Sequence, residues 1–329
     1  MSLENKKVLV TGGAGFIGSN IIEYLLNKNN KVTCLDNFIT GKKENVENFL
    51  SNPNFTMLEG DITNLEDCIE ACKDIDVILH QAALGSVPRS IENPLKTNDI
   101  NINGFINILW AAKKENISRV VYAASSSTYG DSKKLPKIEN EIGSPLSPYA
   151  VTKYVNELYA GVFSNLYGLE LIGLRYFNVF GRKQDPDGAY AAAIPKFIKA
   201  FINHQEPVIH GDGSQSRDFT YIDNVIQANE LAATTKNPDA LNQVYNVACG
   251  DQSFLKELVE NLRDLLSEFD SEIKNIEIKN GPERIGDVKH SLASIEKAQK
   301  LLNYQPTHNL KQGLNSAIEW YWNYFKTNS

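Results

Sequence analysis

The sequence predicts an α/β fold in which one parallel β-sheet is covered by helices on both faces. From the N-terminus to about residue 181, short apolar segments alternate with longer amphipathic ones, as strands alternate with crossover helices. Such crossovers are almost always right-handed, so the alternation builds an open, doubly wound sheet. A glycine-rich turn directly after the first strand supports this fold. Beyond residue 182 the pattern loosens, which predicts a smaller C-terminal α/β lobe.

The first strand and its turn predict a nucleotide site. Lys6 to Val10 is apolar, Thr-Gly-Gly-Ala-Gly-Phe-Ile-Gly follows at 11–18, and a helical pattern runs to about Leu26. Glycines between a strand and a helix let a phosphate approach the backbone at the helix N-terminus. The spacing is G-x-x-G-x-x-G rather than the commoner G-x-G-x-x-G. We expect a Rossmann-like sheet whose cofactor lies against Gly12, Gly15, Phe16, Ile17 and Gly18.

The second strand, Lys31 to Leu35, ends in Asp36 and Asn37. An acid at this position can accept both hydroxyls of an adenosine ribose, and it repels a 2′-phosphate. NAD is therefore favoured over NADP, although two lysines at 42 and 43 lie close by and Asp36 also fits an ordinary loop acid. We expect Asn37 and Gly41 beside the cofactor.

Phe55 to Leu58 and Asp76 to His80 are the next two strands. The acid that follows the first can reach an adenine amino group, and the small residues after the second leave room for a cofactor. His80 reads as a core histidine with satisfied hydrogen bonds. These strand ends place five residues beside the cofactor: Asp61, Ile62, Gln81, Ala82 and Ala83.

Leu84 to Ser90 is predicted to be a loop at a strand end, where open α/β sheets bind ligands. Substrate contacts are expected from Gly85, Ser86, Val87 and Arg89. A long helix should follow from about Pro94 to Glu115. Asparagine is mildly unfavourable inside a helix, so Asn101 is expected to brace the active-site backbone close to the cofactor.

The stretch from Val120 to Lys153 predicts a proton-handling group. An apolar strand ends in the three hydroxyls of residues 125–127, and Ser147 and Pro148 are typical of a helix cap and first helical position. Tyr149 and Lys153 then share one helix face. A free tyrosine has a pKa of about 10. An ammonium about 4 Å away contributes about 4 kcal/mol at an effective dielectric of about 20, roughly 3 pK units. Tyr149 could thus take a proton from a substrate alcohol.

Two other Tyr-x-x-x-Lys pairs begin at Tyr24 and Tyr129, but neither follows a serine-ended strand into a capped helix. The catalytic group is therefore placed at Tyr149, Lys153, Ser125, Ser126 and Ser127.

The remaining elements divide the chain into a cofactor-binding domain, residues 1–181 with about 219–250 returning to it, and a mainly substrate-binding lobe, residues 182–329. The expected elements are strands at Glu170–Tyr176, Pro207–His210, Val244–Ala248 and Ile276–Ile278, helices at Ala191–Asn203, Asp223–Thr235 and Phe254–Phe269, and two terminal helices flanking Pro306. Two loop arginines, Arg217 and Arg284, suit a phosphate group because a guanidinium binds phosphate with two parallel hydrogen bonds, although each also fits an ordinary surface arginine.

The net charge, the apolar runs and the cysteines of the chain argue against several classes of function. The net charge of −7 argues against general nucleic-acid or anionic-membrane binding. No apolar run reaches membrane-span length, and the N-terminus does not read as a signal peptide. The four cysteines lie in or beside apolar segments without a zinc-ligand set, as in a reduced, cytoplasmic protein.

Together these motifs resemble the extended short-chain dehydrogenase/reductase family, and within it the nucleotide-sugar 4-epimerases. The resemblance covers nearly the whole chain. It is carried by Thr-Gly-Gly-Ala-Gly-Phe-Ile-Gly, Leu-Asp-Asn, Gly-Asp-Ile, His-Gln-Ala-Ala, the serines before Tyr-Gly, Tyr-x-x-x-Lys, Arg-Tyr-Phe-Asn-Val-Phe-Gly and Arg-Asp-Phe-Thr-Tyr-Ile-Asp. Leu-Gly-Ser-Val-Pro-Arg-Ser resembles the subgroup acting on UDP-N-acetylhexosamines.

The resemblance implies a tightly held NAD, a homodimer and a UDP-hexose substrate. Tyr149 is then the base, and Lys153 binds the nicotinamide ribose. By position, Tyr176 also belongs to the cofactor site. The UDP-sugar positions correspond to Gly85, Ser86, Val87, Arg89, Ser125, Ser127, Asn178, Val208, His210, Arg217, Arg284, Asp287 and Ser291.

The implied reaction is 4-epimerisation of UDP-N-acetylglucosamine and UDP-N-acetylgalactosamine, with UDP-glucose and UDP-galactose as a further pair. Similar enzymes restricted to non-acetylated sugars have a tyrosine where this chain has Ser291, and a serine leaves room for an acetamido group, although it is also an ordinary loop residue. A 4,6-dehydratase or UDP-glucuronate decarboxylase is the alternative, but residues 126–128 supply no acid there. A non-catalytic NAD-sensing protein is a further alternative.

Overall fold

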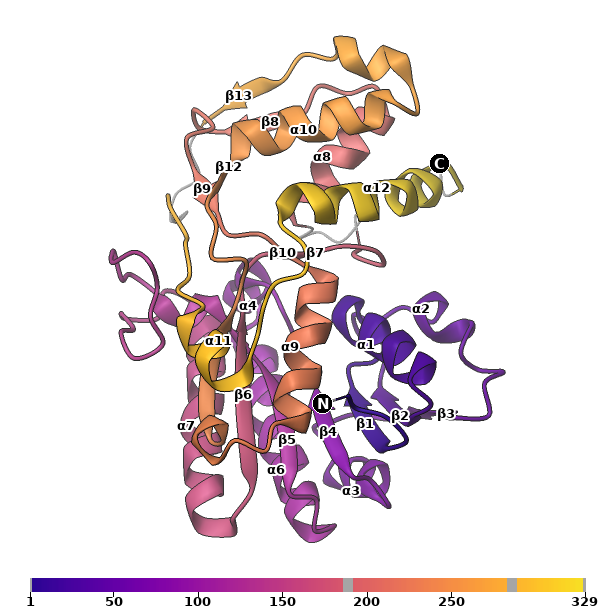
Figure 1. Cartoon of the computed structure of the whole chain (residues 1–329), viewed down its shortest axis with the longest axis vertical. Coiled ribbons are helices and arrows are strands. Elements are labelled where there is room, and N and C mark those ends of the chain that lie inside the picture. Colours follow the sequence, from indigo (N-terminus) through magenta and orange to yellow (C-terminus); the bar gives the residue numbers. More distant parts are fainter. Residues whose placement is uncertain (1, 186–191, 283–288, 328–329) are drawn as a thin grey trace.

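A computed structural model describes residues 2–185, 192–282 and 289–327. Its centre is a parallel sheet of seven strands in the order β11-β6-β5-β4-β1-β2-β3 (Figure 1). The sheet confirms the predicted Rossmann-like α/β class. Its strands are β1 (Lys7–Thr11), β2 (Lys31–Asp36), β3 (Phe55–Glu59), β4 (Val77–His80), β5 (Arg119–Ser125), β6 (Glu170–Tyr176) and β11 (Gln243–Val247).

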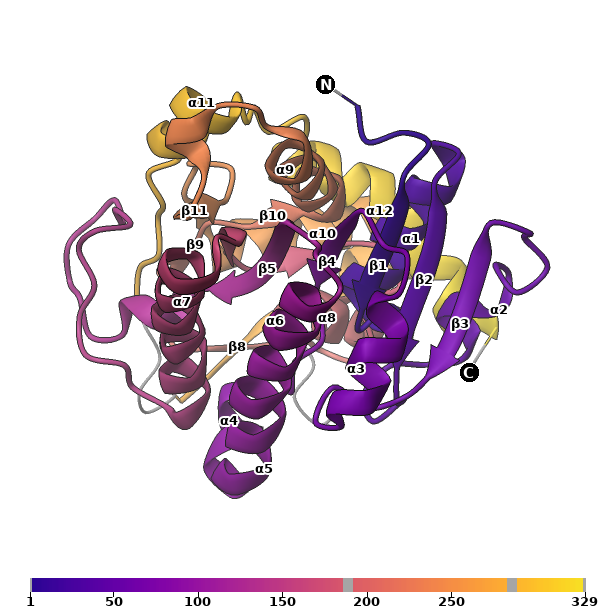
Figure 2. The ribbon, with the colours of Figure 1, turned by 90° about the horizontal axis from the view of Figure 1, so that it is seen from below.

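Helices cover both faces of the sheet (Figure 2). On one face lie α1 (Phe16–Asn27) and α9 (Ile222–Thr234), and on the other α3 (Leu65–Cys72), α6 (Gly104–Lys114) and α7 (Pro148–Tyr167). The buried apolar side chains accordingly form two large clusters, one containing Ile22 and Val225 and the other Phe105 and Leu109. Among the described residues, no helix combines the length and apolar character that crossing a membrane requires.

The sheet places the predicted motifs at one edge. Strand order reverses between β1 and β4, and Thr11 at the end of β1 is in register with both Leu35 and His80. On the next pair, Ser125 at the end of β5 is in register with Tyr176. Open α/β sheets bind ligands beyond the strand ends at such a reversal. The turn after β1 and the residues after β2, β4 and β5 therefore face one space.

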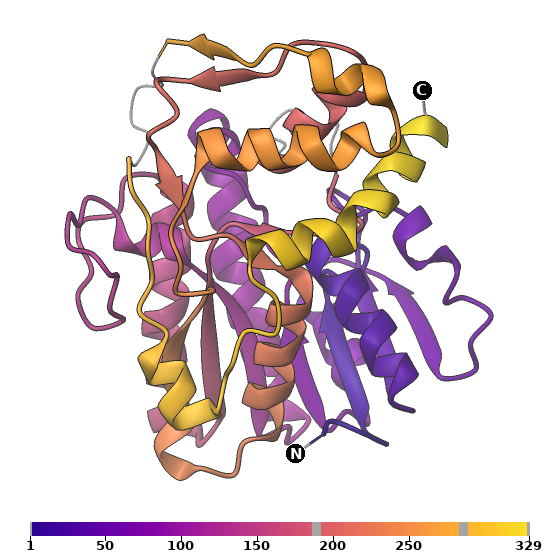
Figure 3. The ribbon, with the colours of Figure 1, turned by 45° about the horizontal axis from the view of Figure 1, so that its top comes forward.

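A second group of elements lies beyond these carboxyl ends (Figure 3). It contains α8 (Ala193–Ile202), α10 (Leu255–Ser267) and α12 (Leu310–Thr327). Short strands accompany them in three pairs: β7 (Val179–Phe180) with β10 (Thr220–Tyr221), β8 (Val208–His210) with β13 (Lys279–Gly281), and β9 (Ser216–Arg217) with β12 (Ser253–Phe254). Smaller helices are α2 (Glu44–Glu47) and α11 (Glu296–Leu302).

Three local predictions were wrong. The strand expected at Ile276–Ile278 lies at Lys279–Gly281, because a 3₁₀ turn at Ser271–Asn275 precedes it and Lys279 pairs with Val208. The loop expected at 84–90 becomes helix α4 (Val87–Glu92), which the Ser86 side chain caps by accepting from Arg89 N. The helix expected at 94–115 is α5 (Pro94–Asn98), a π-helical turn and then α6.

Candidate active site

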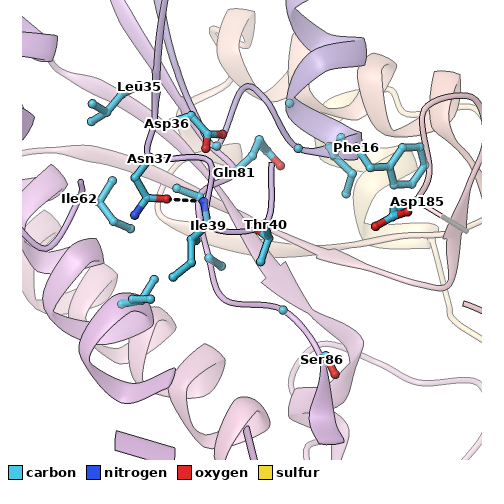
Figure 4. A pocket seen from close by; sticks show the side chains of 18 of the residues that line it. Phe16, Leu35, Asp36, Asn37, Ile39, Thr40, Ile62, Gln81, Ser86 and Asp185 are labelled. Atoms are coloured by element: carbon cyan, nitrogen blue, oxygen red, sulfur yellow. Dashed lines mark hydrogen bonds between the residues drawn. The ribbon is translucent and has the colours of Figure 1, made fainter. Parts of the chain in front are cut away.

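A cavity of about 450 Å³ runs along the carboxyl ends of the strands. Figure 4 shows side chains from the ends of β2 and β4 and from the start of α1 around this space. Its walls include most of the predicted cofactor residues: Gly12, Gly15, Phe16, Ile17, Gly18, Asp36, Asn37, Ile62, Gln81, Ala82 and Ala83. They also include three predicted substrate residues, Gly85, Ser86 and Arg89.

The glycine turn has no room for side chains. Gly12 has φ +69°, and a Cβ there would lie 2.6 Å from Ala82 N. A Cβ on Gly18 would lie 2.2 Å from Gly12 O. Gly15 caps α1 without a side-chain bond, so the first amides of the helix can serve an anion. The turn therefore fits the pyrophosphate of a dinucleotide.

Asp36 is locked to this turn. One carboxylate oxygen accepts from Ala14 N at 2.9 Å and the other from Phe38 N at 2.8 Å. Burial raises the pKa of Asp36, although both hydrogen bonds oppose the rise. Gly41 packs beside it, since a Cβ there would lie 3.0 Å from Asp36 Oδ1. An acid held this way at the end of β2 fits a ribose diol.

Asp61 is engaged by its own neighbours. Asn37 Nδ2 donates to it at 2.8 Å, and Thr63 donates through both its backbone amide and its hydroxyl. Burial acts to raise the pKa of Asp61, but these hydrogen bonds outweigh it and lower the pKa. The cavity wall at this point is formed by Gly60 and Ile62. Asp61 thus orients Asn37, whose Oδ1 accepts from Ile39 N (Figure 4).

The end of β4 is held by two hydrogen-bonded groups. Gln81 contacts Tyr176 Oη at 3.0 Å and Asn229 Oδ1 at 3.1 Å, so Tyr176 positions Gln81. Thr11 Oγ1 lies 2.7 Å from His80 Nδ1 and accepts from Ala82 N at 3.2 Å. Burial lowers the pKa of His80 to about 3, so this buried histidine, hydrogen-bonded as predicted for a core position, is also neutral.

The predicted proton-handling residues meet where β5 and α7 face each other. Ser127 donates to Ser125 Oγ at 2.9 Å through its hydroxyl, and Ser125 also bonds the half-buried Tyr149. Lys153 Nζ donates to Ala123 O at 2.9 Å and lies 6.0 Å from the Tyr149 ring centroid. Ser126 is the first residue of the 3₁₀ turn Ser126–Tyr129, and Ser125 caps that turn.

Burial decides the acidity of both groups. It raises the pKa of Tyr149, and the Ser125 hydrogen bond opposes the rise. The net result is therefore a raised pKa of Tyr149 rather than the lowering expected from the nearby ammonium, because burial is the largest effect on this hydroxyl. Burial lowers the pKa of Lys153 to about 8, against an opposing effect of Glu157.

Asn101 braces the backbone after β4 through direct side-chain hydrogen bonds. It lies in the π-helical turn, where its Oδ1 accepts from Leu84 N at 2.7 Å. Its Nδ2 donates to Thr152 Oγ1 at 3.1 Å. Asn101 therefore joins the segment after β4 to the helix that carries Tyr149.

A second cavity of about 400 Å³ contains four predicted substrate residues: Asn178, Val208, His210 and Arg217. Asn178 has φ +36° and donates to Asp218 O at 2.9 Å. Arg217 Nη1 donates to Ser216 O at 2.9 Å and to Lys289 O at 3.2 Å. Ala192 lines both cavities.

Some predicted residues lie elsewhere. Val87 is 39% exposed on α4 and lines neither cavity. The Ser291 amide donates to Ser216 O, beside Arg217, but Ser291 lines neither cavity. Arg284 and Asp287 lie outside the described residues. Sequence patterns did not indicate several further wall residues: Leu35, Ile39, Thr40, Gly60, Ile100, Gln184, Asp185 and Ala192. Within the described chain, no group of three or more His, Cys, Asp or Glu side chains is placed to hold a metal.

Comparisons with known proteins identify the family of the chain. The chain matches the NAD dependent epimerase/dehydratase family over residues 8–248. A solved UDP-N-acetylglucosamine 4-epimerase from Methanobrevibacter ruminantium, in complex with UDP-N-acetylmuramic acid, is 40% identical with a TM-score of 0.91, covering 98% of this chain and 100% of that one.

Two further proteins extend the comparison. A UDP-glucuronic acid 4-epimerase from Bacillus cereus, solved with UDP-glucuronic acid and NAD, is 32% identical with a TM-score of 0.86, covering 98% of this chain and 100% of that one. The UDP-glucose 4-epimerase of Mycolicibacterium smegmatis is 31% identical over 320 residues, which is 96% of this chain and 99% of that protein. With a glycine turn and a strand-end acid whose geometry fits NAD, the chain belongs to the NAD-dependent epimerase/dehydratase family of extended short-chain dehydrogenases/reductases.

Proposed function

We propose that this protein interconverts UDP-N-acetylglucosamine and UDP-N-acetylgalactosamine by epimerisation at carbon 4, and accepts UDP-glucose and UDP-galactose as a second pair. The observation that carries the proposal is the Ser125–Tyr149–Lys153 group, which comes together where the end of β5 faces α7. The 4-epimerase relatives support the reaction class. We assign residues 1–181 and 219–250 to NAD binding and the remainder mainly to UDP-sugar binding.

Three groups would carry out the proposed reaction: bound NAD, the Tyr149 and Ser125 side chains, and Lys153. Bound NAD supplies a hydride acceptor that can also return the hydride. Tyr149 acts as its phenolate, whose oxygen takes the proton of the substrate 4-hydroxyl and later returns it, while Ser125 hydrogen-bonds the same substrate oxygen. Lys153 compensates the charge on the tyrosine when the proton is away. Turning the 4-keto sugar between the two transfers changes the ring face that receives hydrogen.

The second cavity is proposed to anchor the nucleotide during this turn. Arg217 and Asn178 line this cavity together with Val208 and His210 on β8. A guanidinium binds a diphosphate through paired hydrogen bonds. Firm binding at this end lets the sugar rotate without leaving the protein.

Tyr149→Phe tests the proposal. We expect UDP-N-acetylglucosamine turnover to fall at least about a hundredfold, the low end of a general acid–base contribution. NMR of the products measures it. Tyr24→Phe is the control, because Tyr24 also precedes a lysine by four residues but bonds Glu230 far along the chain. Near-normal epimerisation by Tyr149→Phe would remove the mechanism, and a 4-keto-6-deoxy product from the wild type would indicate a dehydratase.

We further propose a homodimer in the cytoplasm. The α7 helix exposes an apolar row at Val151, Leu158, Val162 and Leu166, and Leu95 on the adjoining α5 is 82% exposed. A contiguous group of exposed apolar side chains is typical of an interaction site. All four cysteines are free, as in a reducing compartment. Light scattering on the purified chain should give twice the monomer mass, and a monomer at micromolar concentration would contradict this assembly.

A further inference from the structure

A buried ion pair joins the helix of Tyr149 to the sheet. Arg175 on β6 donates to Glu157 on α7 through Nε at 2.8 Å and through Nη2 at 2.7 Å. The two side chains are only 4% and 7% exposed. Burying such a pair costs several kcal/mol per ion, and apolar residues of equal volume often serve stability as well. The charges therefore call for an explanation beyond stability.

The position of Glu157 supplies one. Tyr149, Lys153 and Glu157 follow one another at intervals of four residues on α7, so they share one face of the helix. Lys153 is 2% exposed, and its Nζ donates to the neutral carbonyl of Ala123. A buried ammonium with only a neutral acceptor tends to lose its proton. Glu157 is the carboxylate that acts against this loss.

Arg175 holds Glu157 in place and reaches the serine turn. Its Nη1 donates to Glu139 O at 3.0 Å, and its guanidinium carbon lies 4.8 Å from the centroid of the Tyr129 ring. Tyr129 closes the 3₁₀ turn that begins at Ser126. The pair thus fixes α7 relative to the strand end that carries the hydroxyls. Other ionisable groups around the pair and Lys153 are His80 on β4, Tyr122 on β5, Tyr149 on α7, Glu139 before α7 and Lys297 on α11.

We propose that Glu157 is a positioning residue of the reaction, whose carboxylate, oriented by Arg175, keeps the Lys153 side chain cationic while Tyr149 exchanges protons. The inference rests on the proposed function, since the charge of Lys153 matters to turnover only if Tyr149 is the base. Under this proposal, Glu157 and Arg175 have opposite electrostatic effects on the charge of Lys153. A pair with a purely structural role would not show such opposite effects.

Reciprocal substitutions test it. Glu157→Gln leaves the Arg175 cation unbalanced near Lys153, so Lys153 should lose its proton at a lower pH, and kcat at pH 7 should fall about tenfold and partly recover at pH 6. Arg175→Met leaves the Glu157 carboxylate without its cation. The midpoint of the Lys153 titration and the midpoint of the pH profile of kcat should then both move to higher pH. NMR titration of lysine ¹³Cε in the holoenzyme reports Lys153 directly, with Lys153→Arg assigning its signal, and the pH profile of kcat reports its effect.

The chain contains a matched control. Arg119 donates to Glu170 through Nε at 2.9 Å and through Nη2 at 2.6 Å. This pair links the N-terminal ends of β5 and β6, whereas the hydroxyls lie at the carboxyl end of β5. Glu170→Gln should lower the melting temperature without moving the Lys153 titration or the pH profile. If a single variant does not fold, Glu157→Gln/Arg175→Met removes both charges together, and its Lys153 midpoint should lie below that of the wild type.

The outcomes separate the two proposals. Midpoints that stay fixed in Glu157→Gln and Arg175→Met, or that move in the same direction in both, would overturn the role of Glu157. A wild-type protein that binds NAD but turns over no UDP-sugar would overturn the proposed function, while the lysine titration would still report on the ion pair.

Discussion

Gly18→Ala should weaken NAD binding severely, because the glycine turn has no space for one methyl group. The added Cβ would lie 2.2 Å from Gly12 O and 2.7 Å from Gly13 Cα. Both neighbours are backbone atoms, so neither can rotate away as a side chain would. Relief requires that the turn open or that α1 move away from β1.

The magnitude follows from the cost of overpacking, about 1–3 kcal/mol. Without ligand, the variant can relax by opening the turn. NAD requires the closed turn, so most of this cost reappears on binding, and about 1.4 kcal/mol corresponds to each factor of ten in affinity. We expect the NAD dissociation constant to rise between about fivefold and 150-fold.

Calorimetric titration of nucleotide-free protein with NAD measures the effect, and thermal unfolding monitors the fold. Gly161→Ala is the control: it lies in α7, and its added Cβ would have no heavy atom within 4 Å. That substitution should stabilise the protein by about 0.5–1 kcal/mol and leave NAD affinity unchanged. Wild-type NAD affinity in Gly18→Ala would refute the assignment of this turn to the pyrophosphate.

Two further predictions concern the core and the substrate. Because burial lowers the pKa of His80 to about 3, the folded protein resists a proton that the unfolded chain accepts below about pH 6.5, so stability is present above that pH and lost below it. Between pH 7.5 and 5, the free energy of unfolding of His80→Asn should therefore fall by about 2 kcal/mol less than that of the wild type. Urea unfolding at both pH values measures the difference, and an equal fall in the two proteins would contradict the prediction. Ser291→Tyr should abolish turnover of UDP-N-acetylglucosamine but retain that of UDP-glucose, and an equal response in a two-substrate assay would refute the volume argument.

The main sheet could be predicted because its strands are short apolar runs with turn residues after them. The errors arise where tertiary contacts override local preference. Lys279–Gly281 has little β propensity, yet it pairs with β8, whereas the alternating residues at 276–278 remain outside a strand. The π-helical turn at Asp99–Asn103 continues the helical pattern of its flanks, so nothing in the spacing distinguishes it.

The site was predictable where a motif carries it and less so where partners come from distant segments. The glycine turn and Asp36 lie on the cavity wall as expected. Gln81 instead depends on Asn229, 148 residues away, and Lys153 bonds Ala123 O. Such partners follow from the packing of α9 and α7 on the sheet, which no local pattern encodes.

The place of Arg217 in the second cavity suits a reaction in which the sugar turns within its site. A group that must present both faces cannot be held by bidentate ion pairs, because these fix orientation as well as position. The Ser125 hydroxyl bonds Tyr149 and is itself bonded by Ser127, whereas Arg217 lines the second cavity together with residues of β8. Under the proposed function, most binding free energy belongs to the nucleotide end, which tethers the sugar while leaving its rotation open. Truncating Arg217 should then raise KM far more than it lowers kcat, whereas a similar fall in kcat would mean that the arginine also orients the sugar.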